Sequence, residues 1–332
     1  MPQSVTIRDV ARQSGVSVAT VSRVTSGSTR VSDDTRSRVN AVLTSLGYEP
    51  SRLGQALALH RHDAFALVLP GLGGALFAGI LNGFEDVLRG TGITFHILVA
   101  QDPDLFQVQI KDLATRVDGI CVFGSFEGDK MISAIAERMP VVRIAGNPDE
   151  ATESVNVDNF EATRGLTEHL IQVHGLRDLL FLGESLHSPD VRERLRGFHA
   201  ALTDAGIGSV HSAVSCSLTE SSALKAVQEL LLQNDPPQGL VCATDEVAIG
   251  ALLACAAASV SIPGDIAVTG FDDIELAALI TPSLTTANQP FHDIGARAAD
   301  ILLHHARPGL LAATQESQWL PTELIFRRSC GC

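Results

Sequence analysis

The sequence predicts an α/β protein in which two doubly wound lobes follow a small helical headpiece. From Phe65 onward, apolar stretches alternate with helical runs such as LFAGILNGFEDVLRGTG; the stretches are FALVLP, TFHILVA, GICVFGS and VVRIAG, then DLLFLG, GLVCATD and IAVTGFDD. This alternation is typical of βαβ units with parallel sheets, and two such sets predict two lobes with ligand edges at the carboxyl ends of their strands. Residues 1–48 show only helical patterns, enough for three or four short helices.

The first two predicted helices form a helix-turn-helix, which indicates double-stranded DNA as a partner. Thr6 is a candidate N-cap, with Asp9 three residues later. Gly15 allows a tight turn, and Ser17 can cap a second helix that runs through Val24.

The second helix of this motif is expected to have a buried edge and a face for the major groove. Val21 and Val24 belong to the buried edge. The outward face carries small side chains beside one arginine, which suits a major groove; its members are Val18, Ala19, Ser22 and Arg23. The alternative is a helical bundle that only caps the rest of the chain.

A third helix is predicted over residues 33–46, ended by Gly47. Pro50 then interrupts the pattern, residues 51–59 form a short helical stretch, and residues 60–63 are the candidate linker.

The charge of the chain is divided unequally between its two ends. The whole chain carries −14, but residues 1–62 contain eight Arg, no Lys and four acidic residues, a net charge of +4 that leaves −18 for the remainder. A basic headpiece on an acidic body confines DNA to one end.

Cysteine use and hydropathy predict a reducing, cytoplasmic setting. The N-terminus lacks the apolar core of a signal peptide, and no apolar run reaches the length of a transmembrane helix. Cysteines occur at 121, 216, 242, 255, 330 and 332, without zinc-finger spacing, which favours buried structural thiols.

The C-terminal pair Cys330 and Cys332 is expected in a frayed tail, with oxidation or metal binding as the alternative. His169 and His174, five residues apart at a helix end, are expected to face in different directions, so no metal site is predicted. Residues 71–74, GLGG, lack dinucleotide-site spacing, and no nucleophile or base accompanies the Asp272–Asp273 pair, so neither a cofactor nor an enzyme is predicted.

The run TIRDVARQSGVSVATVSRV followed by VSDDTRSRVNAVLTSLGYEPS resembles the headpiece of the lactose-repressor (LacI/GalR) family. The resemblance continues in VDGICVF, RERLRGF, CATDEVAIGAL, PGDIAVTGFDD, PSLTTANQP and LPTELIFRRSCG. It implies two lobes of the periplasmic-binding-protein type I architecture, with the chain crossing between them three times. We place the crossings near residues 158–163, 287–292 and 320–325.

The resulting division has four parts. Residues 1–48 are the headpiece and residues 49–62 the hinge helix and linker. The N-terminal lobe is expected to contain residues 63–160 with 290–322, and the C-terminal lobe residues 161–289 with 323–332.

The resemblance also implies which headpiece residues contact DNA. Val18 and Ala19 occupy the positions that read operator bases, and Arg23 matches an arginine that contacts guanine. The alternative places Val18 in the core and Arg23 on a phosphate. The other expected DNA contacts are Thr6, Ser17, Thr20, Ser22 and Arg30, with Thr35 as a further hydroxyl.

Leu57 matches the family leucine that wedges into the minor groove from a hinge helix, together with the leucine of a second subunit. Leu53, Ala56 and Leu57 share one apolar face on a helix too short to be stable alone. Gly54 lowers its helix propensity by about 1 kcal/mol relative to Ala.

The resemblance implies an effector site between the lobes. Asp245 and Asp272 each follow a predicted strand, where open α/β sheets bind ligands. Arg194 is a further expected contact in this site. The alternative is that Asp245 is only an N-cap and that Arg194 forms only a surface ion pair. The full set of expected effector contacts is Phe77, Arg194, Leu218, Thr244, Asp245 and Asp272.

Departures from the family pattern predict the kind of effector. Thr244 replaces a common Asn, Leu218 stands where an aromatic residue is frequent, and residues 73–75 replace Asn-Pro-Phe. A roomier, less aromatic cleft favours a sugar or polyol over a purine.

Together these observations predict a cytoplasmic, homodimeric transcription regulator, most simply a repressor, whose affinity for operator DNA a small molecule controls. The rival classes are a transport solute-binding protein, which requires a secretion signal and no headpiece, and an enzyme of the same fold, which requires a catalytic constellation.

Overall fold

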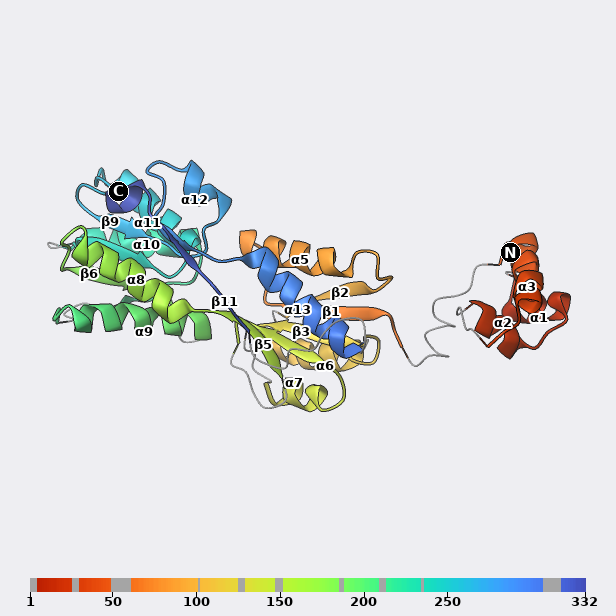
Figure 1. The fold of residues 1–332 in the computed structure, drawn as a ribbon. Helices are drawn as coiled ribbons and strands as arrows, with labels where there is room; N and C mark the ends of the chain where they lie inside the picture. Colours follow the sequence, from red (N-terminus) through yellow and green to blue (C-terminus); the bar gives the residue numbers. More distant parts are fainter. Residues whose placement is uncertain are drawn as a thin grey trace. The chain divides into compact units, whose positions relative to one another are not determined.

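The computed structural model describes residues 5–25, 30–48, 61–100, 102–124, 129–146, 152–184, 188–208, 213–233, 236–306 and 318–332. Contacts divide the chain into two compact units (Figure 1). One contains Met1–Asp63 with Arg116–Asp118, and the other contains Ala64–Thr115 with Gly119–Cys332. We call the first the headpiece unit and the second the body.

The headpiece unit contains three described helices, α1 (Ile7–Ser14), α2 (Val18–Thr25) and α3 (Asp33–Leu46). Their bounds confirm the predicted helix-turn-helix and the third helix. Val10, Val21 and Val39, one from each helix, are fully buried in a common apolar cluster.

Local sequence explains where these helices begin and end. The Thr6 amide and hydroxyl both donate to Asp9 Oδ2, at 3.1 and 2.7 Å, at the start of α1. Ser17 Oγ accepts a hydrogen bond from the Thr20 amide (3.1 Å) at the start of α2. Gly15 and Gly47 end α1 and α3 with φ of 67° and 60°, a left-handed conformation that glycine adopts without strain.

The first lobe of the body is built on a six-stranded sheet of order β11-β5-β4-β3-β1-β2, in which every pairing is parallel. Helices α5 and α13 cover one face and α6 and α7 the other (Figure 1). The elements are β1 (Ala64–Leu69), α5 (Ala75–Leu88), β2 (Thr94–Val99), α6 (Pro103–Leu113), β3 (Gly119–Phe123), α7 (Asp129–Ala136), β4 (Val141–Ile144), β5 (Glu153–Val157), α13 (Phe291–Ala306) and β11 (Gln318–Leu320).

The second lobe has a four-stranded parallel sheet of order β7-β6-β8-β9, with α8 and α9 on one face and α10 and α11 on the other. Its elements are α8 (Asn159–Gln172), β6 (Leu179–Leu182), α9 (Pro189–Asp204), β7 (Ala213–Val214), α10 (Glu220–Leu231), β8 (Gly239–Cys242), α11 (Asp245–Ala257), β9 (Ala267–Thr269), α12 (Glu275–Leu279) and a terminal 3-10 helix, η1 (Arg328–Cys330).

Three segments join the lobes. The chain leaves the first sheet after β5 and enters α8, returns from β10 (Thr286–Asn288) to α13, and leaves again from β11 to β12 (Glu323–Ile325). Strands β10 and β12 pair antiparallel with each other. The four-part division of the chain stays a prediction, but sheet membership changes at these three places.

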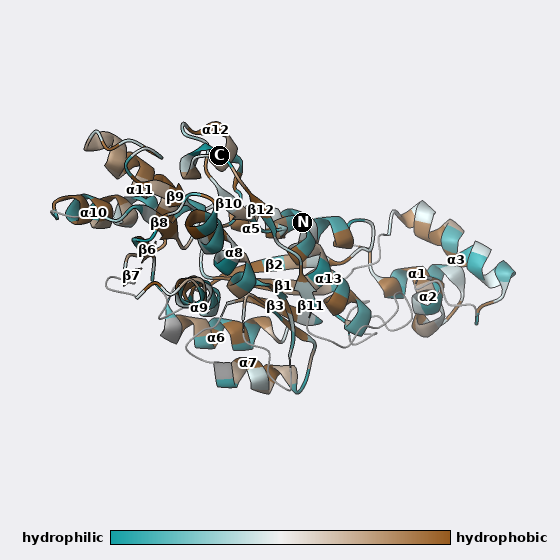
Figure 2. Ribbon diagram, turned by 60° about the vertical axis from the view of Figure 1, so that its left-hand side comes forward, coloured by the Kyte–Doolittle hydropathy of each residue, from teal (hydrophilic) through white to brown (hydrophobic). Residues whose placement is uncertain are grey.

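Each lobe has its own apolar core. In the first lobe the core includes β1 and β3, which are coloured as hydrophobic in Figure 2. Phe65, Leu67, Ile80 and Phe84 are fully buried with α13 side chains in the first core. Leu182, Val247 and Val268 anchor the second. These buried apolar runs are typical of parallel strands covered by helices on both faces.

The seven apolar stretches quoted from the sequence are β1, β2, β3, β4, β6, β8 and β9, which confirms the predicted alternation. Strands β5, β7, β10, β11 and β12 were not predicted. They are short or carry polar residues, and pairing with neighbouring strands sets their conformation. Among the helices of the described ranges, none combines the length and hydrophobicity that crossing a bilayer would require.

Candidate functional site

In the headpiece unit, α2 presents the face that the sequence predicted for DNA. Val18 is 41% exposed, and Ala19 and Arg23 are exposed as well. Val21 and Val24 are buried on the opposite edge. The alternative that places Val18 in the core is therefore wrong, while base reading by these side chains stays a prediction.

The residues predicted to contact phosphates differ in their exposure and in the hydrogen bonds that they already form. Thr6 uses its hydroxyl proton for Asp9, so a phosphate there would compete with the helix cap. Ser17 Oγ lies 2.9 Å from Thr20 Oγ1 and caps α2. Ser22 is half-buried, and Arg30 is exposed just before α3. Leu57 lies outside the described residues.

The body contains a cavity of about 320 Å³ between its lobes. It opens where β1, β3, β4 and β5 end in the first lobe and where β8 and β9 end in the second, as the topology rule for open α/β sheets requires. Five of the six predicted effector residues line it: Phe77, Arg194, Leu218, Thr244 and Asp272.

Arg194 is held rigidly at the cavity wall. Its side chain is 4% exposed and extends from α9, where Nε donates to Asn159 Oδ1 (2.8 Å) and Nη1 to the Ala243 carbonyl (2.6 Å). The guanidinium also lies over the Phe271 ring, 3.6 Å from its centroid. The alternative of a surface ion pair is therefore wrong.

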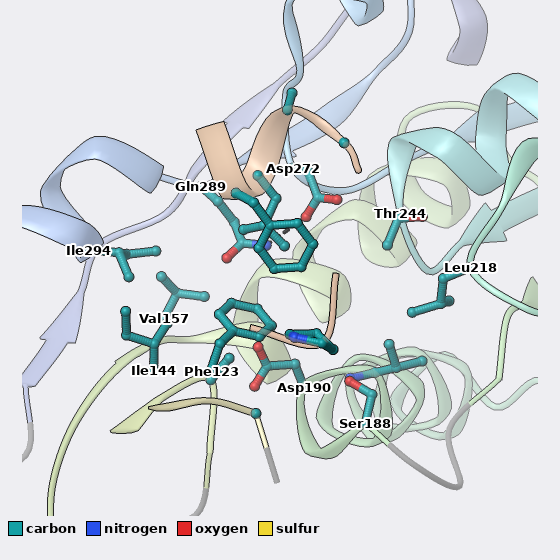
Figure 3. A pocket seen from close by; sticks show the side chains of 18 of the residues that line it. Phe123, Ile144, Val157, Ser188, Asp190, Leu218, Thr244, Asp272, Gln289 and Ile294 are labelled. Carbon is teal, nitrogen blue, oxygen red and sulfur yellow. Dashed lines mark hydrogen bonds between the residues drawn. The ribbon is translucent and has the colours of Figure 1, made fainter. Parts of the chain in front are cut away.

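Asp272, which Figure 3 shows beside Gln289, forms a buried polar group with Arg194. Asp272 Oδ1 lies 3.5 Å from Arg194 Nη1 and accepts a hydrogen bond from Gln289 Nε2 at 2.6 Å. Asp272 has a φ of 118°, a strained value for a residue with a Cβ. Hydrogen bonds from its amide to the Ala287 carbonyl (2.8 Å) and from the Gln289 amide to its carbonyl (3.2 Å) hold that conformation.

Burial shifts the acidic groups of the cavity toward their protonated forms. Burial raises the pKa of Asp272 to about 6, although the Arg194 charge and the Gln289 hydrogen bond oppose the rise. Burial also raises the pKa of Asp190, again opposed by Arg194. The charge of Arg194 acts on both carboxyl groups, so the cavity holds one fixed positive charge and two carboxyl groups that can form hydrogen bonds.

Asp245 is the predicted effector residue that the structure does not place on the cavity. It is fully buried, and its carboxylate accepts hydrogen bonds from the Ile274 amide (2.9 Å) and the Thr286 hydroxyl (2.6 Å). It is not the N-cap either, because Thr244 caps α11 by accepting from the Val247 amide. Asp245 instead joins α11 to the loop after β9 and to β10.

The apolar wall carries one aromatic ring that the sequence did not predict. Phe77 from α5 and Phe123 from the end of β3 pack edge to face, with ring centroids 5.2 Å apart. Leu218 lines the cavity as an aliphatic side chain. That the cleft is less aromatic than those of the family stays a prediction, while Phe123 is a lining ring that the sequence did not indicate.

Sequence reasoning also missed several polar lining residues. Asp190 and Ser188 lie at the start of α9, opposite Asp272 and Gln289 in Figure 3. The signal was present, since Ser188-Pro189-Asp190 after a strand is a typical helix start that faces the ligand edge. Gln289 lies in the PSLTTANQP segment, already part of the family resemblance.

The C-terminal tail and two histidines also depart from prediction. Cys330 is buried in η1, so the tail is not frayed, and the four other predicted buried thiols are buried. His169 and His174 do not face apart, because their Nε2 atoms lie 3.2 Å from each other. Helix α8 ends at Gln172, and Gly175 (φ 69°) reverses the chain, so helical spacing does not apply to His174.

The fold and its two sites define a class of protein: a DNA-binding headpiece joined to a two-lobed ligand-binding body. The family of lacI bacterial regulatory proteins matches residues 6–51, and the periplasmic binding protein-like domain family matches residues 167–330. The chain is 30% identical over 306 residues to the HTH-type transcriptional regulator RegA of Clostridium saccharobutylicum, covering 90% of this chain and 91% of that protein.

Other relatives cover nearly the whole chain. Catabolite control protein A of Priestia megaterium is 28% identical over 335 residues, 98% of this chain and 99% of its own length. A lac repressor dimer bound to operator and the anti-inducer ONPF superposes with a TM-score of 0.85 at 26% identity, covering 99% of both chains. The complex of the regulator CelR with cellobiose gives 0.73 at 28% identity, covering 98% and 99%.

This protein belongs to the lacI family of DNA-binding transcriptional regulators.

Proposed function

We propose that the protein is a homodimeric repressor that binds a palindromic operator and that a sugar or related polyol in the interlobe cavity controls this binding. One observation carries the proposal: the cavity is lined by two aromatic rings from the first lobe and by the carboxylates of Asp190 and Asp272, with Arg194, from the second. A sugar ring offers an apolar face for the former and hydroxyl groups for the latter. The cavity volume of about 320 Å³ is at the small end of the range of roughly 300–1,000 Å³ typical of ligand pockets.

On the DNA side, Val18 and Ala19 would contact base edges in the major groove, and Arg23 would form paired hydrogen bonds to a guanine. Leu57 would insert into the minor groove beside its counterpart from the second subunit. The solved lac repressor dimer bound to operator supports a dimer on DNA for this chain, and action on DNA would take place in the cytoplasm.

Control follows from the position of the cavity. A ligand that touches both lobes binds better to one relative arrangement of the lobes than to another, and so shifts their equilibrium. Cellobiose bound to CelR supports a sugar-type ligand for this chain. Arg194 and Asp272 of the second lobe and Phe77 of the first would sense the same molecule.

The test uses the full-length protein in three steps. Selection from random duplexes should yield an inverted repeat that the protein binds. A thermal-shift screen of monosaccharides, disaccharides, polyols and purines should then find a stabilising sugar, worth about 2.7 kcal/mol at 100 times its dissociation constant. That sugar should change affinity for the selected operator, whereas stabilisation by purines alone would refute the sugar proposal.

A further inference from the structure

The C-terminal end of the body brings together four groups that are common metal ligands. His169 lies in the last turn of α8 and His174 just after it, while Cys330 belongs to η1 and Cys332 follows it. Their donor atoms all lie within 4.8 Å of one another. The cluster lies apart from the cavity, because none of the four residues lines it.

Four of the six distances among these atoms match those of a tetrahedral metal site. With zinc at about 2.05 Å from nitrogen and about 2.3 Å from sulfur, tetrahedral geometry puts two nitrogens roughly 3.3 Å apart and a nitrogen and a sulfur roughly 3.6 Å apart. The two Nε2 atoms are 3.2 Å apart. Cys332 Sγ lies 3.3 Å from His169 Nε2 and 3.6 Å from His174 Nε2, and Cys330 Sγ lies 3.6 Å from His169 Nε2.

Gly331 allows the two cysteines to meet on one side. Its φ of 109° is a value that residues with a Cβ rarely adopt, and a Cβ there would lie 3.2 Å from the His174 ring. A glycine between the cysteines therefore lets the chain turn Cys332 back toward the histidines that Cys330 already faces.

The surrounding contacts fix the tail and the histidines in place. The Ser329 hydroxyl donates to the Val268 carbonyl (2.6 Å), and the Ser329 amide donates to the Ser283 carbonyl (2.9 Å). Thr285 Oγ1 lies 3.0 Å from Cys330 Sγ, where a hydroxyl can support a thiolate ligand. The His169 ring stacks on Phe326, with centroids 3.9 Å apart.

We propose that His169, His174, Cys330 and Cys332 bind one zinc ion per chain in a tetrahedral structural site. Two imidazoles and two thiolates are a donor set that zinc prefers, and with four protein ligands no position is left for a substrate. The ion ties the C-terminal residues to the end of α8, the first helix after the chain crosses into the second lobe. Binding releases the thiol protons, because the cysteine ligands coordinate as thiolates.

The experiment titrates cobalt(II) into tag-free, full-length protein that has been stripped of metal and kept reduced. Saturation at one cobalt per chain is expected, with the visible bands of a tetrahedral complex and a thiolate-to-cobalt charge-transfer band, and zinc should displace both signals. Cys332→Ser, at the exposed cysteine, and His174→Gln, just beyond the end of α8, should lower cobalt affinity at least tenfold while keeping the wild-type circular dichroism.

Matched controls are Cys255→Ala and His199→Gln, which alter a thiol and an imidazole outside the cluster and should titrate like wild type. Zinc should raise the melting temperature of wild type and of both controls, but not of the two ligand variants. Three results would each overturn the proposal: no charge-transfer band, a band unchanged in both ligand variants, or a Cys330–Cys332 disulfide in the reduced preparation. None of these measurements involves DNA or a sugar, so they stand or fall separately from the proposed function.

Discussion

A single charged side chain on α2, Arg23, separates sequence recognition from general affinity for DNA. It is exposed beside the small residues Val18 and Ala19. We expect Arg23→Ala to weaken binding to the selected operator by roughly 1–3 kcal/mol and to relax the preference at one guanine. Fluorescence anisotropy with operator and scrambled duplexes measures both effects.

The matched control is Arg12→Ala on α1, because Arg12 is also exposed and pairs with Asp9 (2.6 Å) rather than facing from α2. This change should affect specific and scrambled duplexes alike. If Arg23→Ala lowers both affinities equally, Arg23 contacts only the phosphate backbone.

The protonation of Asp272 should make sugar binding depend on pH. Burial raises its pKa to about 6, so the side chain is an anionic acceptor above that pH and a neutral acid below it. Hydroxyl donors of a sugar favour the anion, so affinity should be highest above pH 6 and fall by about tenfold per pH unit well below it. Calorimetric titration at pH 7.5, 6.5 and 5.5 measures this trend.

Asp272→Asn is the control for that titration, since it keeps the shape but removes the ionisable group. It should bind the sugar more weakly at pH 7.5 and with little change across the range. A wild-type profile that is equally flat would show that Asp272 does not sense the ligand.

At the scale of single residues, the sequence predicted helix caps, which depend on residues only a few positions apart. It did not predict the orientation of side chains whose partners lie far away in the sequence. The caps of α1 and α2 follow from Thr6, Asp9 and Ser17. Asp245 matched a family position, but its carboxylate is directed at Ile274 and Thr286, which are distant in sequence. The residues next to Asp245 in the sequence do not indicate these partners.

Helices α5 and α13, which cover one face of the first sheet, approach each other so closely that glycines of one helix face backbone atoms of the other. A Cβ on Gly83 would lie 1.8 Å from the His292 carbonyl oxygen, and one on Gly295 would lie 2.0 Å from the Ile80 carbonyl oxygen. Gly83→Ala should therefore force the helices apart and lower the free energy of unfolding by about 1–3 kcal/mol. Urea denaturation followed by circular dichroism measures the change.

Gly208→Ala is the comparison, because a Cβ at that glycine has no atom within 4 Å. It should leave the urea midpoint nearly unchanged. A Gly83→Ala protein as stable as wild type would mean that the two helices are not in the close contact described.

Elements were predictable in proportion to how strongly their own residues dictate them. Six of the seven apolar strands and the run that forms α5 carry buried side chains that make them recognisable from pattern alone. Strand β2 was found from its apolar residues although its side chains are half-buried or exposed. Strand β5 contains Ser154 and Asn156, both buried, whose polarity hides it from a hydrophobic pattern. The antiparallel pair β10 and β12 joins segments 35 or more residues apart, which no local pattern specifies.

For the whole molecule, the site is a product of topology more than of motif. Two sets of parallel strands end on the same cavity, so Phe123, Asp190 and Gln289 meet there although they lie in separate parts of the chain. The sequence therefore indicated that a ligand-binding edge exists, and it predicted several of the lining residues that the second lobe contributes. The sequence could not predict the contact between the two phenylalanine rings or the cluster of two histidines and two cysteines, because both depend on segments that are far apart in the chain.

If the cavity controls the headpiece, the coupling must be reciprocal. A sugar that changes operator affinity by a given factor must itself bind with affinity changed by that factor when operator is present, because both describe one thermodynamic cycle. Typical coupling of about 1–3 kcal/mol predicts a change of roughly 5- to 150-fold in each direction. Calorimetry of sugar binding to free and operator-bound protein, beside operator titrations with and without sugar, measures both factors. Arg23→Ala should bind the sugar like wild type in the absence of DNA, since Arg23 belongs to the headpiece unit and does not line the cavity. Unequal factors would mean that the two titrations do not follow the same binding event, so the sugar bound in calorimetry is not the one that acts on DNA binding.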